Sequence, residues 1–259
     1  MIRWIQLALL LSLVFAGCAR KSHEGLIVGM ELSYPPFEMI DETGKPAGIS
    51  VDLAHALGET LHTPVKIENI PFDGLLPSLK TGRIDLILSS MTATTERAQS
   101  IDFSEPYLNT GLAILANAKS DVQSIDDLNR TGRTVVVKNN TTGHLYATEH
   151  LTAAHLLALD QESACVLEVT QGKADAFLYD QMSTLRNSLQ NPQTTRPLLQ
   201  PFKKEQWAIG IRKGNDGLRQ KINEALAQLR ANGEFDRLGD KWLKNEKQNF
   251  QKLGVPFVF

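Results

Sequence analysis

The sequence is poor in cysteine and in net charge, and each shortage excludes a class of protein. Only two cysteines, Cys18 and Cys165, occur among the 259 residues. Cys165 lies in the apolar stretch SACVL at 163–167, and we interpret it as a small buried hydrophobic residue rather than a reactive thiol. The formal net charge is −2 at pH 7 and there is no lysine- or arginine-rich run, so we expect no nucleic-acid-binding surface.

The usual sequence motifs of hydrolases and metalloenzymes are missing as well. Neither G-x-S-x-G nor H-E-x-x-H occurs. Glu149, His150 and His155 stand close together in the chain, but they lack the i, i+4 spacing of a helical zinc pair. Heptad repeats, low-complexity tracts and obvious internal repeats are also absent. We therefore expect no catalytic residues of these kinds, no metal and no cofactor.

The N-terminal segment is typical of an export signal. Arg3 precedes an almost wholly apolar run at 4–15, and small residues lead to Cys18. This run is shorter than the roughly 20 residues that a membrane-spanning helix needs. The segment FAGC at 15–18 resembles the bacterial lipobox, in which the cysteine becomes the lipidated first residue. The alternative is a plain signal peptide that carries an accidental cysteine.

A lipobox implies both a location and a constraint on disulfide bonding. We expect a lipoprotein signal peptide at 1–17 and a lipid anchor on Cys18. The protein would then be exported and held at a membrane, facing the periplasm, or the outer face of the plasma membrane in a Gram-positive bacterium. With Cys18 lipidated, Cys165 has no partner, so no disulfide is expected within the chain.

Apolar runs that alternate with helical patterns predict an α/β fold. Five short apolar runs are typical of strands in a parallel sheet, at 26–30, 65–70, 84–88, 134–137 and 174–179. Helical patterns occur at 49–61, 73–79, 181–189, 218–231 and 234–244. Glycine-containing turn signals separate these elements, and the alternation favours the α/β class.

Polar and aromatic side chains follow the ends of these five strands. The residues are Glu31, Tyr34, Phe72, Ser90, Thr92, Arg97, Lys138, Thr142 and Asp180. In open α/β sheets, ligands bind beyond the carboxyl ends of the strands. The set offers the fork of a guanidinium for a carboxylate and a carboxylate for an ammonium. It is therefore able to hold a zwitterion.

Each of these residues also has an ordinary structural explanation. In the stretch SSMTATTER at 89–97, Thr94 can cap the helix that follows it, and Arg97 can lie on the solvated face of that helix. Asp180 can cap the next helix of the second half in the same way, and the two aromatic residues can be core. The order of the five strand ends favours the joint interpretation as a ligand site.

Several motifs resemble those of the polar amino-acid-binding proteins of bacterial ABC importers, in solute-binding protein family 3 (the lysine/arginine/histidine/glutamine type). Their order and spacing agree with the family over residues 26–243. The motifs are GMELSYPPFE at 29–38, GISVDLA at 48–54, FDGLLPSL at 72–79, SMT at 90–92 with ER at 96–97, IDFS at 101–104, GKADA at 172–176, LRANG at 229–233 and KW at 241–242. Ile49 and Ser50 depart from the GFDVDLA of the family.

The resemblance implies two α/β lobes, each a central sheet flanked by helices, which are joined by two crossing hinge strands and close on a ligand. The first lobe would comprise 25–106 and 208–259, and the second lobe 112–202. The hinges would lie near 107–111 and 203–207. A protein of this type is a monomer that passes a polar amino acid to the permease subunits of an ABC transporter.

The resemblance also implies a role for each candidate residue. Arg97 corresponds to the arginine that holds the α-carboxylate of the ligand. Ser90 and Thr92 correspond to residues that donate to that carboxylate or accept from the ammonium, and Thr142 to a backbone contribution from the second lobe. Asp180 corresponds to the carboxylate that binds the α-ammonium. Tyr34 and Phe72 correspond to the two aromatic walls of the site. Glu31 corresponds to the acid that recognises the ligand side chain.

The identity of the amino acid stays open at this point. Glu31 between two aromatic faces suits a cationic side chain such as that of arginine or lysine. Lys138 favours glutamine instead, because its position resembles that of a lysine in glutamine binders and because it would repel a cationic ligand. Arginine or lysine is slightly favoured, with glutamine as the close alternative.

Two other functions share this fold. One is a periplasmic enzyme resembling cyclohexadienyl dehydratases, with Glu31 as a general acid. Such an enzyme must neutralise a dicarboxylate, and the balance of Arg97 and Lys138 against Glu31 and Asp180 suits a zwitterion better, so we expect a binding protein. The other is a lipid-tethered receptor that passes its closed form to a signalling partner. The tail at 245–259 extends past the usual end of the family.

Overall fold

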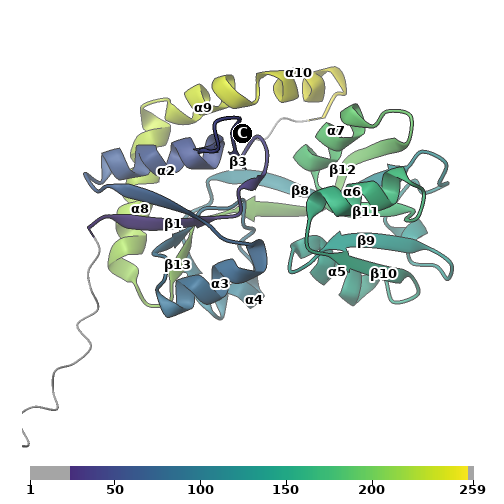
Figure 1. Cartoon of the computed structure of the whole chain (residues 1–259), viewed down its shortest axis with the longest axis horizontal. Helices are drawn as coiled ribbons and strands as arrows, with labels where there is room; N and C mark the ends of the chain where they lie inside the picture. Colours follow the sequence, from purple (N-terminus) through teal and green to yellow (C-terminus); the bar gives the residue numbers. More distant parts are fainter. Residues whose placement is uncertain (1–23, 256–259) are drawn as a thin grey trace, which may run out of the picture.

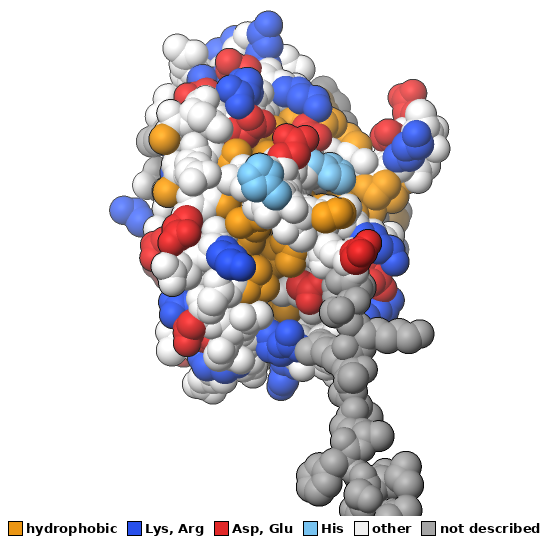
Figure 2. All heavy atoms as spheres, turned by 90° about the vertical axis from the view of Figure 1, so that its left-hand side faces the viewer, with side chains coloured by type: hydrophobic (Ala, Val, Ile, Leu, Met, Phe, Trp, Pro, Cys, Tyr) orange, Lys and Arg blue, Asp and Glu red, His pale blue; other side chains and the backbone are white. Residues whose placement is uncertain are grey.

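The computed structural model describes residues 24–255 as two α/β lobes that lie side by side (Figure 1). The predicted signal peptide and Cys18 fall outside these residues. Within 24–255, no helix has the length and apolar character needed to cross a membrane. On the face of the first lobe that points away from the second, side chains of both charge signs are interspersed (Figure 2).

The first lobe is built on a five-stranded sheet with the order β5-β1-β6-β13-β7. The strands are β1 (Leu26–Met30), β5 (Val65–Asn69), β6 (Leu86–Ile87), β7 (Ile101–Phe103) and β13 (Gly210–Arg212). Strand β1 pairs in parallel with β5 and β6, whereas β13 is antiparallel to β6 and β7. A small sheet of β2 (Ser33–Tyr34), β3 (Glu38–Ile40) and β4 (Pro46–Ala47) stands beside it.

Helices cover both faces of this sheet because side chains of a strand point alternately to opposite sides. Val28 and Met30 of β1 belong to one buried cluster, and Ile27 packs against another. The first cluster is covered by α2 (Ile49–Thr60), α8 (Asp216–Ala231) and α9 (Glu234–Trp242), and the second by α3 (Phe72–Thr81). The short helix α4 (Thr95–Ala98) precedes β7.

The second lobe has a five-stranded sheet with the order β10-β9-β11-β8-β12. Its strands are β8 (Leu108–Asn117), β9 (Thr134–Lys138), β10 (His155–Leu159), β11 (Ala176–Asp180) and β12 (Thr195–Trp207). Val135 and Val137 pack into the cluster of α5 (Thr142–His150), and Val136 into that of α6 (Glu162–Thr170). A short 3-10 helix, η1 (Asp126–Leu128), lies between β8 and β9, and α7 (Gln181–Gln190) follows β11.

Strands β8 and β12 carry the chain between the two lobes (Figure 1). They pair antiparallel from Leu108 opposite Trp207 to Leu112 opposite Lys203. The domain and hinge boundaries given above stay a prediction. The lobes are in contact, since Met182 and Leu185 of α7 share a buried cluster with Tyr34 and Trp207.

The C-terminal part of the described chain forms one more helix, α10 (Lys244–Lys252), which extends from α9 toward α7 in Figure 1. Phe250 of this helix is buried in the large cluster of the first lobe, and Val255 packs against it. The tail at 245–255 thus packs onto the protein, and the last four residues lie outside the described part.

The predicted two-lobed α/β fold is confirmed, and its sheets are mixed rather than purely parallel. The five predicted strands are present within one or two residues, and they divide between two mixed sheets. Three of them (β1, β5 and β6) lie in the first sheet, and two (β9 and β11) in the second. The antiparallel strand β13, with β7 beyond it, completes the first sheet, and the antiparallel strands β8 and β12 together with the parallel strand β10 complete the second. Cys165 is fully buried, as predicted, and burial raises the pKa of its thiol to about 12.

Candidate functional site

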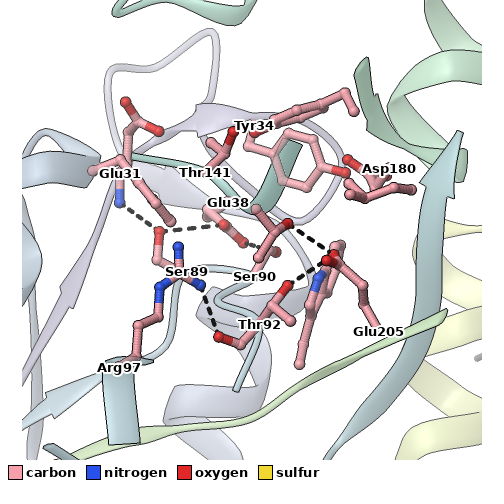
Figure 3. Close-up of a pocket in the computed structure, with 15 residues that line it drawn as sticks. Glu31, Tyr34, Glu38, Ser89, Ser90, Thr92, Arg97, Thr141, Asp180 and Glu205 are labelled. Atoms are coloured by element: carbon pink, nitrogen blue, oxygen red, sulfur yellow. Dashed lines mark hydrogen bonds between the residues drawn. The ribbon is translucent and has the colours of Figure 1, made fainter. Parts of the chain in front are cut away.

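A cavity with about 450 Å³ of unfilled space, part of it open to solvent, lies between the lobes. Figure 3 shows the side chains that surround it. Eight of the nine residues predicted from the strand ends line this cavity; the ninth, Lys138, is not among the lining residues but is paired with one of them, Glu31. Seven further residues line it too: Glu38, Ser89, Leu112, Thr141, Tyr179, Glu205 and Trp207.

Arg97 is a buried cation that pairs with no carboxylate of the described chain. Its side chain is 7% exposed, and it donates from Nη1 to the carbonyl of Thr92 at 2.7 Å and from Nη2 to that of Asn140 at 2.9 Å. Loss of hydration on burial lowers the pKa of Arg97 to about 10. No ion pair of Arg97 exists within residues 24–255. Because Asn140 belongs to the second lobe, this side chain also ties the two lobes together.

The stretch at 89–97 both caps a helix and shapes the cavity. Thr94 accepts a hydrogen bond from the amide of Arg97 at 3.2 Å and thereby caps α4, as the ordinary explanation predicts. The other ordinary explanation, a solvated Arg97, is wrong. Ser90 has a left-handed backbone with φ of 47°, which turns the chain so that the hydroxyls of Ser89 and Ser90 both reach Glu38.

Glu31 and Lys138 form a buried ion pair across the two lobes. Glu31 follows β1 of the first lobe, and Lys138 ends β9 of the second. The ammonium of Lys138 also lies 5.5 Å from the centre of the Phe72 ring, as does the guanidinium of Arg97. Much of the aromatic surface that the sequence predicts for a ligand cation is thus already in contact with two cations of the protein.

Glu38 is a buried carboxylate of the cavity that the strand-end argument missed. It lies in β3 of the small sheet and is 1% exposed. Ser50 and Ser90 donate to its Oε2 at 2.6 and 3.1 Å, and Ser89 donates to Oε1 at 3.3 Å. Burial raises the pKa of Glu38 to about 8, and the nearby charge of Glu31 acts in the same direction. Ser50, one of the two departures from the family motif, is therefore part of this network.

Asp180 serves as a helix cap and also faces the cavity. Its Oδ1 accepts hydrogen bonds from the amides of Met182 and Ser183 at 2.9 and 3.0 Å, which cap α7. The residue is 6% exposed, and burial raises the pKa of its carboxyl to about 6. Within the described chain Asp180 has no ion pair, because the nearby Arg186 pairs with Glu162 instead.

Glu205 is the second carboxylate that the sequence argument missed, because it stands in a segment predicted to be only a hinge. Its Oε2 accepts hydrogen bonds from the hydroxyls of Thr92 and Thr142, each at 3.0 Å. Thr142 is the first residue of α5, and Gly143 after it lets that helix approach β11, since a Cβ there would lie 2.5 Å from the carbonyl oxygen of Leu178. Burial raises the pKa of Glu205.

Stacked aromatic rings close the cavity on the side of Tyr34. The Tyr34 ring stacks on Phe37 at 5.4 Å between centroids and meets Tyr179 and Trp207 edge-on at 5.9 and 6.0 Å. These rings come from the first lobe, from β11 and from the end of β12. Tyr34 therefore lines the cavity and is also part of the core.

The charges around the cavity do not balance. After Glu31 and Lys138 neutralise each other, the carboxyl groups of Glu38, Asp180 and Glu205 face one guanidinium, that of Arg97. Within residues 24–255 none of these four groups has a partner of opposite charge. A ligand with one negative charge would pair with Arg97, and positive charges on the same ligand would stabilise the ionised forms of these acids, whose pKa values burial raises. No cluster of potential metal ligands occurs in the described part of the chain.

Comparison with known proteins relates this chain to amino-acid-binding proteins. The family model of bacterial extracellular solute-binding proteins, family 3, matches residues 26–245. The L-cystine-binding protein TcyJ of Escherichia coli K12 is 28% identical over 224 residues, covering 86% of this chain and 84% of that protein. The L-arginine-binding protein of Pseudomonas aeruginosa PAO1 is 32% identical over 234 residues, covering 83% and 86%.

The fold of the chain matches solved structures of the same kind. The solved structure of an ancestral arginine-binding protein bound to arginine superimposes with a TM-score of 0.80 at 33% identity. The match covers 85% of this chain and 98% of the ancestral protein.

Proposed function

The chain belongs to the bacterial extracellular solute-binding proteins of family 3, and we propose that it binds a basic L-amino acid, arginine or lysine, between its lobes. It would deliver this amino acid to the permease of an ABC transporter. The observation that carries the proposal is the pairing deficit at the cavity. Among the described residues 24–255, the buried Arg97 has no anion in an ion pair with it, and the buried Asp180 has no such cation.

An α-amino acid supplies both missing partners with one molecule. Its carboxylate can accept from the guanidinium fork of Arg97, whose remaining N–H groups are not used by the carbonyls of Thr92 and Asn140. Its ammonium can bind Asp180, whose Oδ1 already holds the start of α7. Leaving either charge buried and unpaired would cost several kcal/mol, so the cavity favours a zwitterion.

The remaining carboxylates favour a ligand whose side chain is also cationic. Ser89 accepts from the amide of Glu31 and donates to Glu38, so these two acids lie together at one part of the cavity. Lys138 neutralises only Glu31. Within residues 24–255 the carboxyl of Glu38 has hydroxyl donors but no cation, and burial keeps it largely protonated at pH 7. A guanidinium or ammonium of the ligand would stabilise its ionised form. We therefore assign side-chain recognition to Glu38, with Glu31 beside it.

Glutamine is the second candidate, and the Glu31–Lys138 pair is the observation that favours it. A carboxylate and an ammonium side by side can bind a neutral amide, because the carboxylate accepts from its NH2 group and the ammonium donates to its carbonyl. This interpretation gives Glu38 no part in reading the ligand side chain, which makes it the weaker of the two. An enzyme of the dehydratase type is weaker again, since a dicarboxylate would add a negative charge to a cavity that already has an excess of acids.

The proposed function also includes where the protein is held and which protein receives its ligand-bound form. Lipid anchoring at Cys18 would keep the binding protein, a monomer, at the membrane that holds the permease. A receptor that passes the closed form to a signalling protein would use the same site.

A thermal-shift screen with the twenty amino acids tests the proposal. Arginine or lysine at about 100 times its dissociation constant should stabilise the native state by roughly 2.7 kcal/mol. A protein that responds to glutamine and to neither basic amino acid would support the amide interpretation. Stabilisation by no amino acid would contradict the proposed function.

A further inference from the structure

Glu205 of the hinge strand β12 has one carboxylate oxygen that accepts two hydrogen bonds and one that accepts none from the described protein. Oε2 accepts the hydroxyls of Thr92 and Thr142, while the buried Oε1 has no hydrogen-bond partner in the described protein. The residue is only 6% exposed and lines the cavity beside Thr92 (Figure 3). Burying an oxygen of this kind without a donor is costly, so Oε1 is placed to receive one from a ligand.

The two threonine contacts determine what this wall of the cavity can recognise. A hydroxyl has a single hydrogen, and Thr92 and Thr142 both direct theirs to Glu205. Each threonine therefore offers only lone pairs to a ligand. A ligand carboxylate needs donors and gains nothing from such a wall, whereas an ammonium has three hydrogens to donate.

No cation of the described protein pairs with Glu205. Arg97 lowers the pKa of Glu205 only through its charge at a distance, and the hinge residue Lys203 does the same. Carbonyl groups, and no carboxylate, hold the guanidinium of Arg97. Arg97, which offers hydrogen-bond donors, and the group of Glu205, Thr92 and Thr142, which offers acceptors, are thus two separate parts of one cavity.

We propose that Glu205 binds the α-ammonium of the amino acid directly through Oε1, as a second acceptor beside Asp180, and that it orients Thr92 and Thr142 as additional acceptors. This inference rests on the proposed function. Because Oε2 joins Thr92 of the first lobe to Thr142 of the second, an ammonium held here would contact both lobes and the hinge strand at once.

A binding cycle with an analogue that lacks the ammonium tests the role of Glu205. L-arginine and 5-guanidinopentanoate, which is arginine without its α-amino group, are titrated into the wild type and into Glu205→Gln. We expect Glu205→Gln to weaken L-arginine by about tenfold or more and the analogue by less than about twofold. Gln206→Ala, an exposed change at the next position of the same strand, should alter neither affinity.

Several results would overturn the inference. An equal loss for both ligands would show that Glu205 only ties the lobes together, and a gain in L-arginine affinity would show that it competes with the ligand carboxylate. If Glu205→Gln does not fold, the wild type can still refute the inference, because an analogue that binds within about threefold of L-arginine has lost no ammonium contact. Absence of binding by all twenty amino acids would instead refute the proposed function, and this inference with it.

Discussion

Replacing Glu38 by glutamine should remove a pH dependence that is specific to cationic ligands. A pKa of about 8 in the empty cavity means that roughly one tenth of the Glu38 carboxyls are ionised at pH 7. Pairing with a ligand cation requires the ionised form. Ionising Glu38 at pH 7 therefore costs about 1.4 kcal/mol, one pKa unit, and reduces the affinity about tenfold. At pH 8 the reduction is only about twofold.

The expected result is a roughly fivefold gain in arginine affinity between pH 7 and pH 8, with about 0.9 proton released per ligand bound at pH 7. Titration calorimetry in buffers of different ionisation enthalpy measures both. Glutamine binding should change little over this range, which separates Glu38 from Asp180, whose pKa of about 6 affects every amino acid. In Glu38→Gln, arginine should bind more weakly and release no proton.

The same group should affect the stability of the ligand-free protein. The folded-state pKa of Glu38 is raised above the ordinary value of 4.5, so the folded protein binds more protons than the unfolded chain between these values. The free energy of unfolding should therefore fall as the pH rises from about 4.5 to about 8, and less so in Glu38→Gln. The other ionisable groups near this carboxyl are Glu31, Tyr107 and Tyr179.

An affinity for arginine that does not change between pH 7 and pH 8, in a wild type that binds it tightly, would refute the assignment of Glu38. A matching change in Glu38→Gln would refute it as well, because the titrating group would then lie elsewhere.

Two further predictions concern Lys138 and Cys18. Lys138→Met removes the counter-ion of Glu31, so calorimetry should show the ratio of arginine to glutamine affinity rising about tenfold, the result of one recovered charge–charge contact; a falling ratio would support the amide interpretation. Cys18→Ser should move the protein from the membrane fraction to the soluble fraction of the cell envelope, and a wild type that is wholly soluble with an unmodified Cys18 would contradict the lipid anchor.

The sequence contains enough information to predict the main parallel strands and the strand-end residues. Strand β1 matches its prediction at both ends, because a short apolar run between a glycine and a charged residue has few alternatives. The burial of Arg97 could not be predicted, since it depends on a carbonyl of Asn140 in the other lobe. That contact is set by how the lobes close, which no local pattern encodes.

The two missed carboxylates show where local patterns fail. Glu38 stands inside the motif at 29–38, but it belongs to a small sheet rather than to the end of a parallel strand. Ser50 is a sequence feature from which the role of Glu38 could have been predicted, because a hydroxyl at a position that departs from the family motif suggests a new hydrogen-bond partner. Glu205 lies in KKEQW at 203–207, where its charged neighbours suggest solvent exposure, and only the pairing of β12 with β8 turns it inward.

The central claim is that Arg97 holds the α-carboxylate of a basic amino acid, and calorimetric titration of L-arginine into wild type and Arg97→Ala tests it most directly. Charge-assisted hydrogen bonds are worth about 1.5–3 kcal/mol each, so losing two should weaken binding by at least about a hundredfold. Arg97→Lys should restore only part of the affinity, because an ammonium lacks the planar fork. A folded Arg97→Ala protein, judged by far-UV circular dichroism, that binds within about threefold of wild type would contradict the account.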